Sequence, residues 1–353
     1  MKAAALRLER QHLSKRVPVT SLPKVVADLC GVDAEDASAT HLTLWSRTKG
    51  LRRRALEAAL GDRRTLVKTW LYRGRLHIVA AADLGMALAA LRDDAEQRLR
   101  AELEDRGVDW DAVETITDAA GEALRGAWLS PKELAMIVGR TAGPKAGEML
   151  RFGWADLLRP AAARGLVCFG PARGNEPTFV RPDEWIDGYA EPYPSEGRAQ
   201  LVRRYLRTFG PATAADVEAW SGIGRADIKI ALDELPVAEV GDAFVLRRDQ
   251  KAAAKTGEDV RLVGNHDPYL RAYASTDHAL EPNRRRSLGG KGAVLHRGRV
   301  IGCWDPERHG GRMVVRIRLW GKVTKVQCEA ISDQADEAGR FLGAAACDVE
   351  FTK

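Results

Sequence analysis

The chain has 353 residues, enough for two or three domains that each bury a hydrophobic core. Its apolar fraction of 45% and charged fraction of 29% are ordinary for a globular protein, and Lys and Arg exceed Asp and Glu by 55 − 49 = 6. This small cationic surplus permits binding to nucleic acid without requiring it. No apolar run approaches the roughly 20 residues of a membrane helix, and we expect no signal peptide.

The cysteines and histidines give no metal signature. The five cysteines are odd in number and far apart, so they predict neither a disulfide framework nor a zinc site. The seven histidines form no HExxH or similar arrangement. We therefore expect a reduced, cytoplasmic protein with no metal and no other cofactor.

Two stretches of the chain share an order in which helices precede a hairpin. In residues 1–127 the expected elements are helices at 37–47 and 51–60, a hairpin at 69–79 and a long helix from Asp83 to about Glu104. Residues 128–192 open with Ser130, Pro131 and Glu133, which have the spacing of a capping box. The elements expected after them are a helix at 147–164 and strands at 165–170 and 178–181.

A third stretch, residues 193–250, shows this order most clearly. Its expected elements are helices at 201–206, 214–220 and 225–234 and a hairpin at 236–247, the order of a winged helix-turn-helix. After a polar linker at 250–255, residues 257–353 form a β-rich part. Its expected elements are strands at 260–263, 293–296, 300–304 and 313–320 and a helix at 330–341. The predicted fold class is α+β, with four domains along the chain.

Four short phrases occur in a fixed order along the chain. They are Trp70–His77 (WLYRGRLH), the GPAT of residues 210–213 between Tyr205 and Trp220, the DPYL of residues 267–270 and the GCW of residues 302–304. As an ordered set they resemble the winged-helix family of bacterial DNA glycosylases that includes AlkZ and YcaQ. The resemblance extends from about residue 20 to about residue 342, nearly the whole chain.

The resemblance implies three tandem winged helices that form a C-shaped DNA channel, followed by a β-barrel-like domain. It also implies a metal-independent, monofunctional DNA glycosylase of base excision repair that acts as a monomer on double-stranded DNA. The expected substrates are alkylated bases, chiefly N7-alkylguanine. In some members of the family the activity extends to bulky adducts and to crosslinks formed by antibiotics, which would suit self-resistance.

The family's catalytic motif, Gln-Φ-Gln or Gln-Φ-Asp with Φ apolar, corresponds here to Asp33-Ala34-Glu35. An N7-alkylated purine is already a good leaving group, so catalysis needs a stabilised sugar cation and an activated water. Carboxylates two residues apart face one side of an extended backbone, and both could reach one pocket. We assign water activation to Glu35, and water positioning or cation stabilisation to Asp33. The alternative is that Asp33, Glu35 and Asp36 are acids in the dipole field of the following helix, at 37–47.

The expected DNA contacts are basic residues of the first hairpin and of three other segments. They are Arg47, Arg73, Arg75, His77, Arg173, Arg284, Arg285 and Arg286. For Arg73, Arg75 and His77, on the hairpin at 69–79 (the first wing), the alternative is a solvated turn with one hydrogen-bonded core histidine. For the run at 284–286, the alternative is a solvated loop. The resemblance places Asp267 and Tyr269 in a lesion pocket, although they could instead cap a turn and fill an interface.

The alternative to an enzyme is a protein that binds DNA without catalysis. Winged helices are more often binding modules than enzymes, so a transcription regulator or a damage sensor is the alternative to a glycosylase. No part of the sequence resembles an effector domain, and three tandem units favour wrapping a duplex over reading a palindrome as a dimer.

Overall fold

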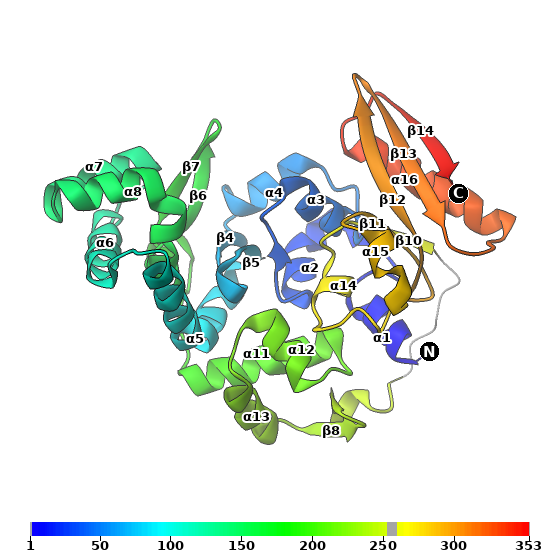
Figure 1. Ribbon diagram of the computed structural model, residues 1–353, viewed down its shortest axis with the longest axis horizontal. Coiled ribbons are helices and arrows are strands. Elements are labelled where there is room, and N and C mark those ends of the chain that lie inside the picture. The colour runs from blue at the N-terminus through cyan, green and yellow to red at the C-terminus, as the bar shows by residue number, and fades with distance from the viewer. Residues whose placement is uncertain (1, 253–259, 353) are drawn as a thin grey trace. The chain divides into compact units, whose positions relative to one another are not determined.

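The computed structural model describes residues 2–252 and 260–352 (Figure 1). Its contacts divide the chain into two compact units, each assembled from separate stretches of sequence. Unit 1 comprises residues 1–53, 204–219 and 236–353, and unit 2 comprises residues 54–203 and 220–235. Among the described helices, none is both long enough and apolar enough to cross a membrane.

The helices of unit 1 are α1 (Lys2–Arg10), α2 (Leu22–Asp28), α3 (Ala37–Trp45), α14 (Pro268–Arg271), α15 (Arg285–Leu288) and α16 (Lys325–Phe341). Those of unit 2 are α5 (Leu84–Asp105), α6 (Trp110–Ala123), α7 (Pro131–Thr141), α8 (Pro144–Leu157), α9 (Arg159–Ala163), α10 (Pro182–Trp185) and α13 (Arg225–Glu234). The chain passes between the units within α4 (Arg53–Leu60), α11 (Pro194–Phe209) and α12 (Ala214–Ser221). The 3₁₀ turns are η1 (Val19–Ser21), η2 (Tyr72–Gly74), η3 (Ala81–Asp83), η4 (Arg247–Asp249) and η5 (Pro282–Arg284).

The strands of unit 1 are β1 (Val17–Pro18), β2 (Val32–Asp33), β3 (Thr48–Lys49), β8 (Val237–Val240), β9 (Ala243–Leu246), β10 (Val260–Val263), β11 (Gly292–His296), β12 (Arg299–His309), β13 (Arg312–Leu319) and β14 (Ala346–Thr352). Those of unit 2 are β4 (Leu66–Trp70), β5 (Leu76–Ala80), β6 (Cys168–Arg173) and β7 (Glu176–Val180).

Unit 2 is built on two hairpins that join in the order β5-β4-β6-β7. Aromatic rings from these strands fill its core: the Phe169 ring centroid lies 4.8 Å from that of Trp70 and 5.2 Å from that of Phe179. The buried faces of α6, α7 and α8 pack against the same cluster. Helices α7 and α8 approach closely where glycine faces glycine. A Cβ on Gly147 would lie only 2.6 Å from the Cα of Gly139, so a larger residue at 147 would push the helices apart.

The predicted elements of residues 128–192 are largely present. Ser130 caps α7, and its capping box with Glu133 is formed. The helix predicted at 147–164 is instead two helices, α8 and α9, because the chain turns at Leu158 and Pro160 stands in the first turn of α9. Helix α6, which lies in a stretch where no element had been predicted, completes the core of unit 2.

The C-terminal sheet of unit 1 has the strand order β10-β11-β12-β13-β14. Its first four strands are antiparallel, whereas β14 runs parallel to β13. Helix α16 makes the crossover between them and lies along the sheet (Figure 1), burying Ile331, Ala335 and Ala338. The described strands show no pairing of β10 with β14, so the sheet is open and the expected barrel is not closed.

Candidate functional site

The segment that carries Asp33 and Glu35 lies between α2 and α3. A tight turn follows α2, in which Cys30 and Gly31 have φ angles of 58° and 105°. Glycine adopts the second angle without strain, and the chain then enters the two-residue strand β2. This strand ends at Asp33, so the extended backbone on which we based the side-by-side placement stops before Glu35.

Local hydrogen bonds fix the loop between β2 and α3. The main-chain N–H of Glu35 donates to Asp33 Oδ1 at 3.0 Å, which orients the Asp33 carboxylate. Asp36 is the N-cap of α3 and accepts from the Ala39 N–H at 2.9 Å. The buried hydroxyl of Thr40 lies 2.8 Å from the main-chain oxygens of both Asp33 and Asp36. Thr40 therefore ties both ends of the loop to α3, and the Glu35 side chain is exposed.

Asp28, at the end of α2, anchors the start of this segment. Its carboxylate pairs with His12 at 2.7 Å and with Lys24, and its main-chain oxygen accepts from the Thr208 hydroxyl. Burial alone would raise the pKa of Asp28, but the hydrogen bonds from His12 and Lys24 outweigh it and lower the pKa below its ordinary value. The end of α2, just before the motif, is thus held by two charge-assisted contacts to the Asp28 carboxylate and by one hydrogen bond to its main-chain oxygen.

Arg47 is fully buried. Its guanidinium has no exposed area and forms two hydrogen bonds of 2.7 Å with the equally buried carboxylate of Asp267. The same guanidinium donates to the Thr43 main-chain oxygen and to the Ser46 hydroxyl. The expectation that Arg47 contacts phosphate does not fit this placement, since a buried, neutralised guanidinium cannot reach a phosphate in this conformation.

Asp267 and Tyr269 match the alternative that the sequence left open. Asp267 caps α14 by accepting from the Tyr269 N–H at 2.9 Å. The Tyr269 ring is fully buried in a core cluster with Leu8, Leu13 and Leu295, and its hydroxyl donates to the Gly298 oxygen at 2.9 Å. Burial raises the pKa of Tyr269 to about 12. Both residues hold unit 1 together, and in this conformation neither presents its side chain to solvent.

The first wing places Arg73, Arg75 and His77 around one turn. Arg73 and Arg75 are exposed, as phosphate contacts must be. The φ angle of Arg73 is 54° and that of Gly74 is 69°, a conformation that glycine adopts with the least strain. A Cβ on Gly74 would also lie 2.5 Å from Arg159 Nη2. His77 is largely buried: its Nδ1 donates to the Arg75 oxygen at 2.9 Å.

The remaining predicted DNA contacts lie on two separate loops. Arg173, at the end of β6, pairs with Glu133 at 2.8 Å and donates to the Trp128 oxygen at 2.6 Å. Arg285 pairs with Asp277 at 2.6 Å, and the Arg284 guanidinium lies 5.6 Å from the centre of the Trp320 ring. Arg286 is exposed. Arg173 and Arg285 are therefore partly neutralised by carboxylates, whereas Arg286 is an exposed cation.

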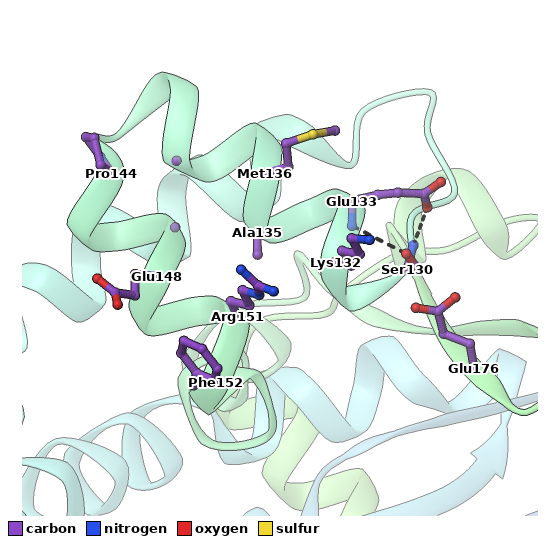
Figure 2. A pocket seen from close by; sticks show the side chains of 12 residues that line it. Ser130, Lys132, Glu133, Ala135, Met136, Pro144, Glu148, Arg151, Phe152 and Glu176 are labelled. Carbon is purple, nitrogen blue, oxygen red and sulfur yellow. Dashed lines mark hydrogen bonds between the residues drawn. The ribbon is translucent and has the colours of Figure 1, made fainter.

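A hollow of about 860 Å³ is lined by residues of α7 and α8, and none of its lining residues belongs to the Asp33-Ala34-Glu35 motif. Figure 2 shows side chains that line it, among them Lys132, Arg151, Met136 and Phe152. Phe152 is 77% exposed and Met136 is 51% exposed. Residues 2–252 and 260–352 contain no group of three or more His, Cys, Asp or Glu side chains that could hold a metal.

Comparison with known proteins identifies the family. A sequence model of the family "DNA glycosylase AlkZ-like" matches residues 26–341, most of this chain. The chain belongs to the AlkZ-like DNA glycosylase family. The interstrand DNA cross-link repair glycosylase of Streptomyces sahachiroi is 30% identical to this AlkZ-like protein over 322 residues, covering 85% of this chain and 86% of that one. The structure of Streptomyces sahachiroi DNA glycosylase AlkZ matches with a TM-score of 0.88 at 26% identity, covering 99% of this chain and 98% of that one.

The match confirms the predicted family and the mixed α and β composition. Membership places this AlkZ-like protein among the DNA-binding glycosylases of DNA repair. Within the chain, the structure brings the Arg47 and Asp267 side chains together, and it joins the main-chain N–H of Glu35 to the Asp33 carboxylate. Sequence reasoning missed Thr40, which ties the motif to α3. Its only sequence signal is its position, four residues after the N-cap Asp36, where a hydroxyl can reach back to the preceding turn.

Proposed function

We propose that this AlkZ-like protein is a monofunctional, metal-independent DNA glycosylase that hydrolyses the N-glycosidic bond of alkylated bases, with N7-alkylguanine as the principal class. The observation that carries the proposal is the Asp33-Ala34-Glu35 loop at the family's motif position, held by Thr40 and the cap of α3. Such anchoring fixes the backbone that carries Asp33 and Glu35, so that less of the loop must be ordered for the reaction.

The proposed reaction needs one water and one proton acceptor. The bond from the sugar C1′ to the base nitrogen breaks, and the positively charged alkylated base leaves neutral with the bonding electrons. Water oxygen bonds to C1′ and its proton passes to the Glu35 carboxylate. Asp33, oriented by the Glu35 N–H, positions the water or stabilises the cationic sugar. No lysine lies in the motif, so we assign no lyase step.

The wider substrate range follows from the relative. Because the Streptomyces sahachiroi protein is named an interstrand DNA cross-link repair glycosylase, we extend the proposal to bulky and crosslinked adducts. We further propose that the protein acts as a monomer, with its three helix-and-hairpin stretches as winged helices that contact duplex DNA. Exposed Arg73, Arg75 and Arg286 are its candidate phosphate contacts.

Single-turnover excision from a duplex with one N7-methylguanine tests the proposal, with the abasic product detected by alkaline cleavage. Glu35→Gln removes the proton acceptor and keeps the shape, so we expect the rate to fall by about 10²-fold or more. The matched control is Asp36→Asn, which removes a carboxylate from the same loop but keeps a good N-cap. It should stay within about threefold of the wild-type rate.

Each outcome decides one part of the proposal. An unchanged rate in Glu35→Gln would reject Glu35 as the base. A wild-type protein that excises neither N7-methylguanine nor a bulky N7 adduct, yet binds the duplex, would favour the non-catalytic alternative.

A further inference from the structure

Three cations lie in the turn after α3 and at the first residue of α4. Lys49, Arg52 and Arg53 lie within five residues, and all three side chains are exposed. Within residues 2–252 and 260–352 none of the three forms an ion pair. By contrast, the exposed Arg100 and Arg106 each pair with an acid, at 2.9 and 2.7 Å. The patch is thus a local excess of positive charge that no acidic side chain in the described part of the chain neutralises.

The backbone that presents this patch is held by strand pairing at its start and by one buried leucine. Strand β3, with Thr48 and Lys49, pairs in parallel with β1, and the Val17 N–H donates to the Arg47 oxygen at 2.9 Å. Leu51 is buried between the cations. Gly50 has a φ of 71°, and the space around its missing side chain is open. The chain therefore holds these cations at a defined place on the surface of unit 1.

The buried ion pair next to the turn explains how it is anchored. Arg47 immediately precedes β3. Its guanidinium forms two hydrogen bonds with the carboxylate of Asp267, the N-cap of α14, which lies 220 residues further along the chain. The pair has no exposed surface and so cannot itself bind a large ligand. Arg47 and Asp267 are positioning residues for the turn.

We propose that Lys49, Arg52 and Arg53 grip backbone phosphates of duplex DNA. The inference rests on the proposed function and names a contact surface for it. Guanidinium groups bind phosphate oxygens in a bidentate manner, and cationic side chains that neutralise phosphates release the counterions condensed on the DNA. A protein partner fits less well, because none of the exposed large hydrophobic side chains of the described chain lies within residues 46–53.

The test measures affinity for an undamaged duplex as a function of salt concentration. Each lost phosphate contact lowers the magnitude of the slope of log K against log[salt] by about 0.9. Arg52→Gln/Arg53→Gln should therefore lower it by about 2 and weaken binding on the order of tenfold at 0.1 M salt. Arg52→Lys/Arg53→Lys keeps the charges and should keep the slope. The matched control, Arg100→Gln/Arg106→Gln, removes two arginines that are already neutralised and should also leave the slope unchanged.

An unchanged slope in Arg52→Gln/Arg53→Gln would overturn the proposal, as would an equal loss in the control pair. Because the duplex is undamaged, the result does not depend on excision. A reduced slope in a protein that excises no base would leave the phosphate contact established and the glycosylase proposal rejected.

Discussion

His278 is a buried titratable side chain in unit 1 with no part in the proposed chemistry. Its Nε2 donates to the Tyr269 oxygen at 2.8 Å, and its ring centroid lies 4.0 Å from that of Tyr273. Burial first, and then repulsion from Arg7, lowers the pKa of His278 to about 4, while Asp216 opposes the shift. The folded state therefore keeps this imidazole neutral at pH values where the unfolded chain protonates it.

We predict that this histidine makes stability depend on pH below neutrality. Because the folded pKa is depressed, its contribution is complete above pH 6.5 and is lost as the pH falls from 6.5 towards 4. The loss amounts to at most about 3 kcal/mol. Urea unfolding from pH 7 to 4.5 should show a shallower decline for His278→Gln, whose amide can still donate to Tyr269. Exposed His309→Gln is the control, and parallel curves for all three proteins would refute the prediction.

At the scale of single residues, local roles could be predicted and distant partners could not. The Ser130–Glu133 capping box depends on residues three apart, and it is formed as expected. Arg47 was assigned to phosphate because an arginine after a helix gives no sign of its partner. That partner, Asp267, lies 220 residues away in sequence, and only the folded chain shows that the two neutralise each other.

At the scale of elements, the Arg47–Asp267 pair joins α3 to α14, and we predict strong coupling between them. Asp267→Leu alone leaves a buried guanidinium without its carboxylate and should cost about 3–5 kcal/mol of unfolding free energy. Arg47→Met alone should cost a similar amount. The double variant removes both charges and should be more stable than either single variant, as chemical denaturation can measure. Additive losses would show that the two charges do not interact.

Helix and strand positions followed from periodicity where each element was amphipathic on its own. Helix α13 is found at 225–234 and β10 at 260–263, as predicted. The break between α8 and α9 was missed because apolar residues continue through it and only Pro160 marks the second helix. The barrel-like domain is an expectation from the family resemblance, and the strand patterns alone fit either a small sheet or a barrel. They give no sign of β14, whose parallel position depends on the crossover through α16.

At the scale of the whole molecule, the division into units does not follow the order of the chain. Residues 1–53, which carry the Asp33-Ala34-Glu35 motif, belong to the same unit as the C-terminal sheet. Leu8 and Leu13 are buried against Tyr269 and Leu295, and the Tyr205 hydroxyl donates to the Ala272 oxygen at 2.5 Å. Patterns read along a sequence locate neighbours in the chain, so this grouping had no signal in the composition or in the motifs.

We therefore predict that the motif cannot fold without the C-terminal part of the chain. A protein ending at Gln250 lacks Asp267 and Tyr269, so Arg47 would be left as an unpaired buried charge and the core around Leu8 would be open. Hydrogen exchange should be fast throughout residues 1–53, while α5 to α8 stay protected because unit 2 loses none of its own residues. Excision should be abolished in this truncated protein, although Asp33 and Glu35 are present. Protection of residues 1–53 equal to that in the intact protein would instead show that the N-terminal segment folds on its own, and the positioning role given to Asp267 would then fall with the prediction.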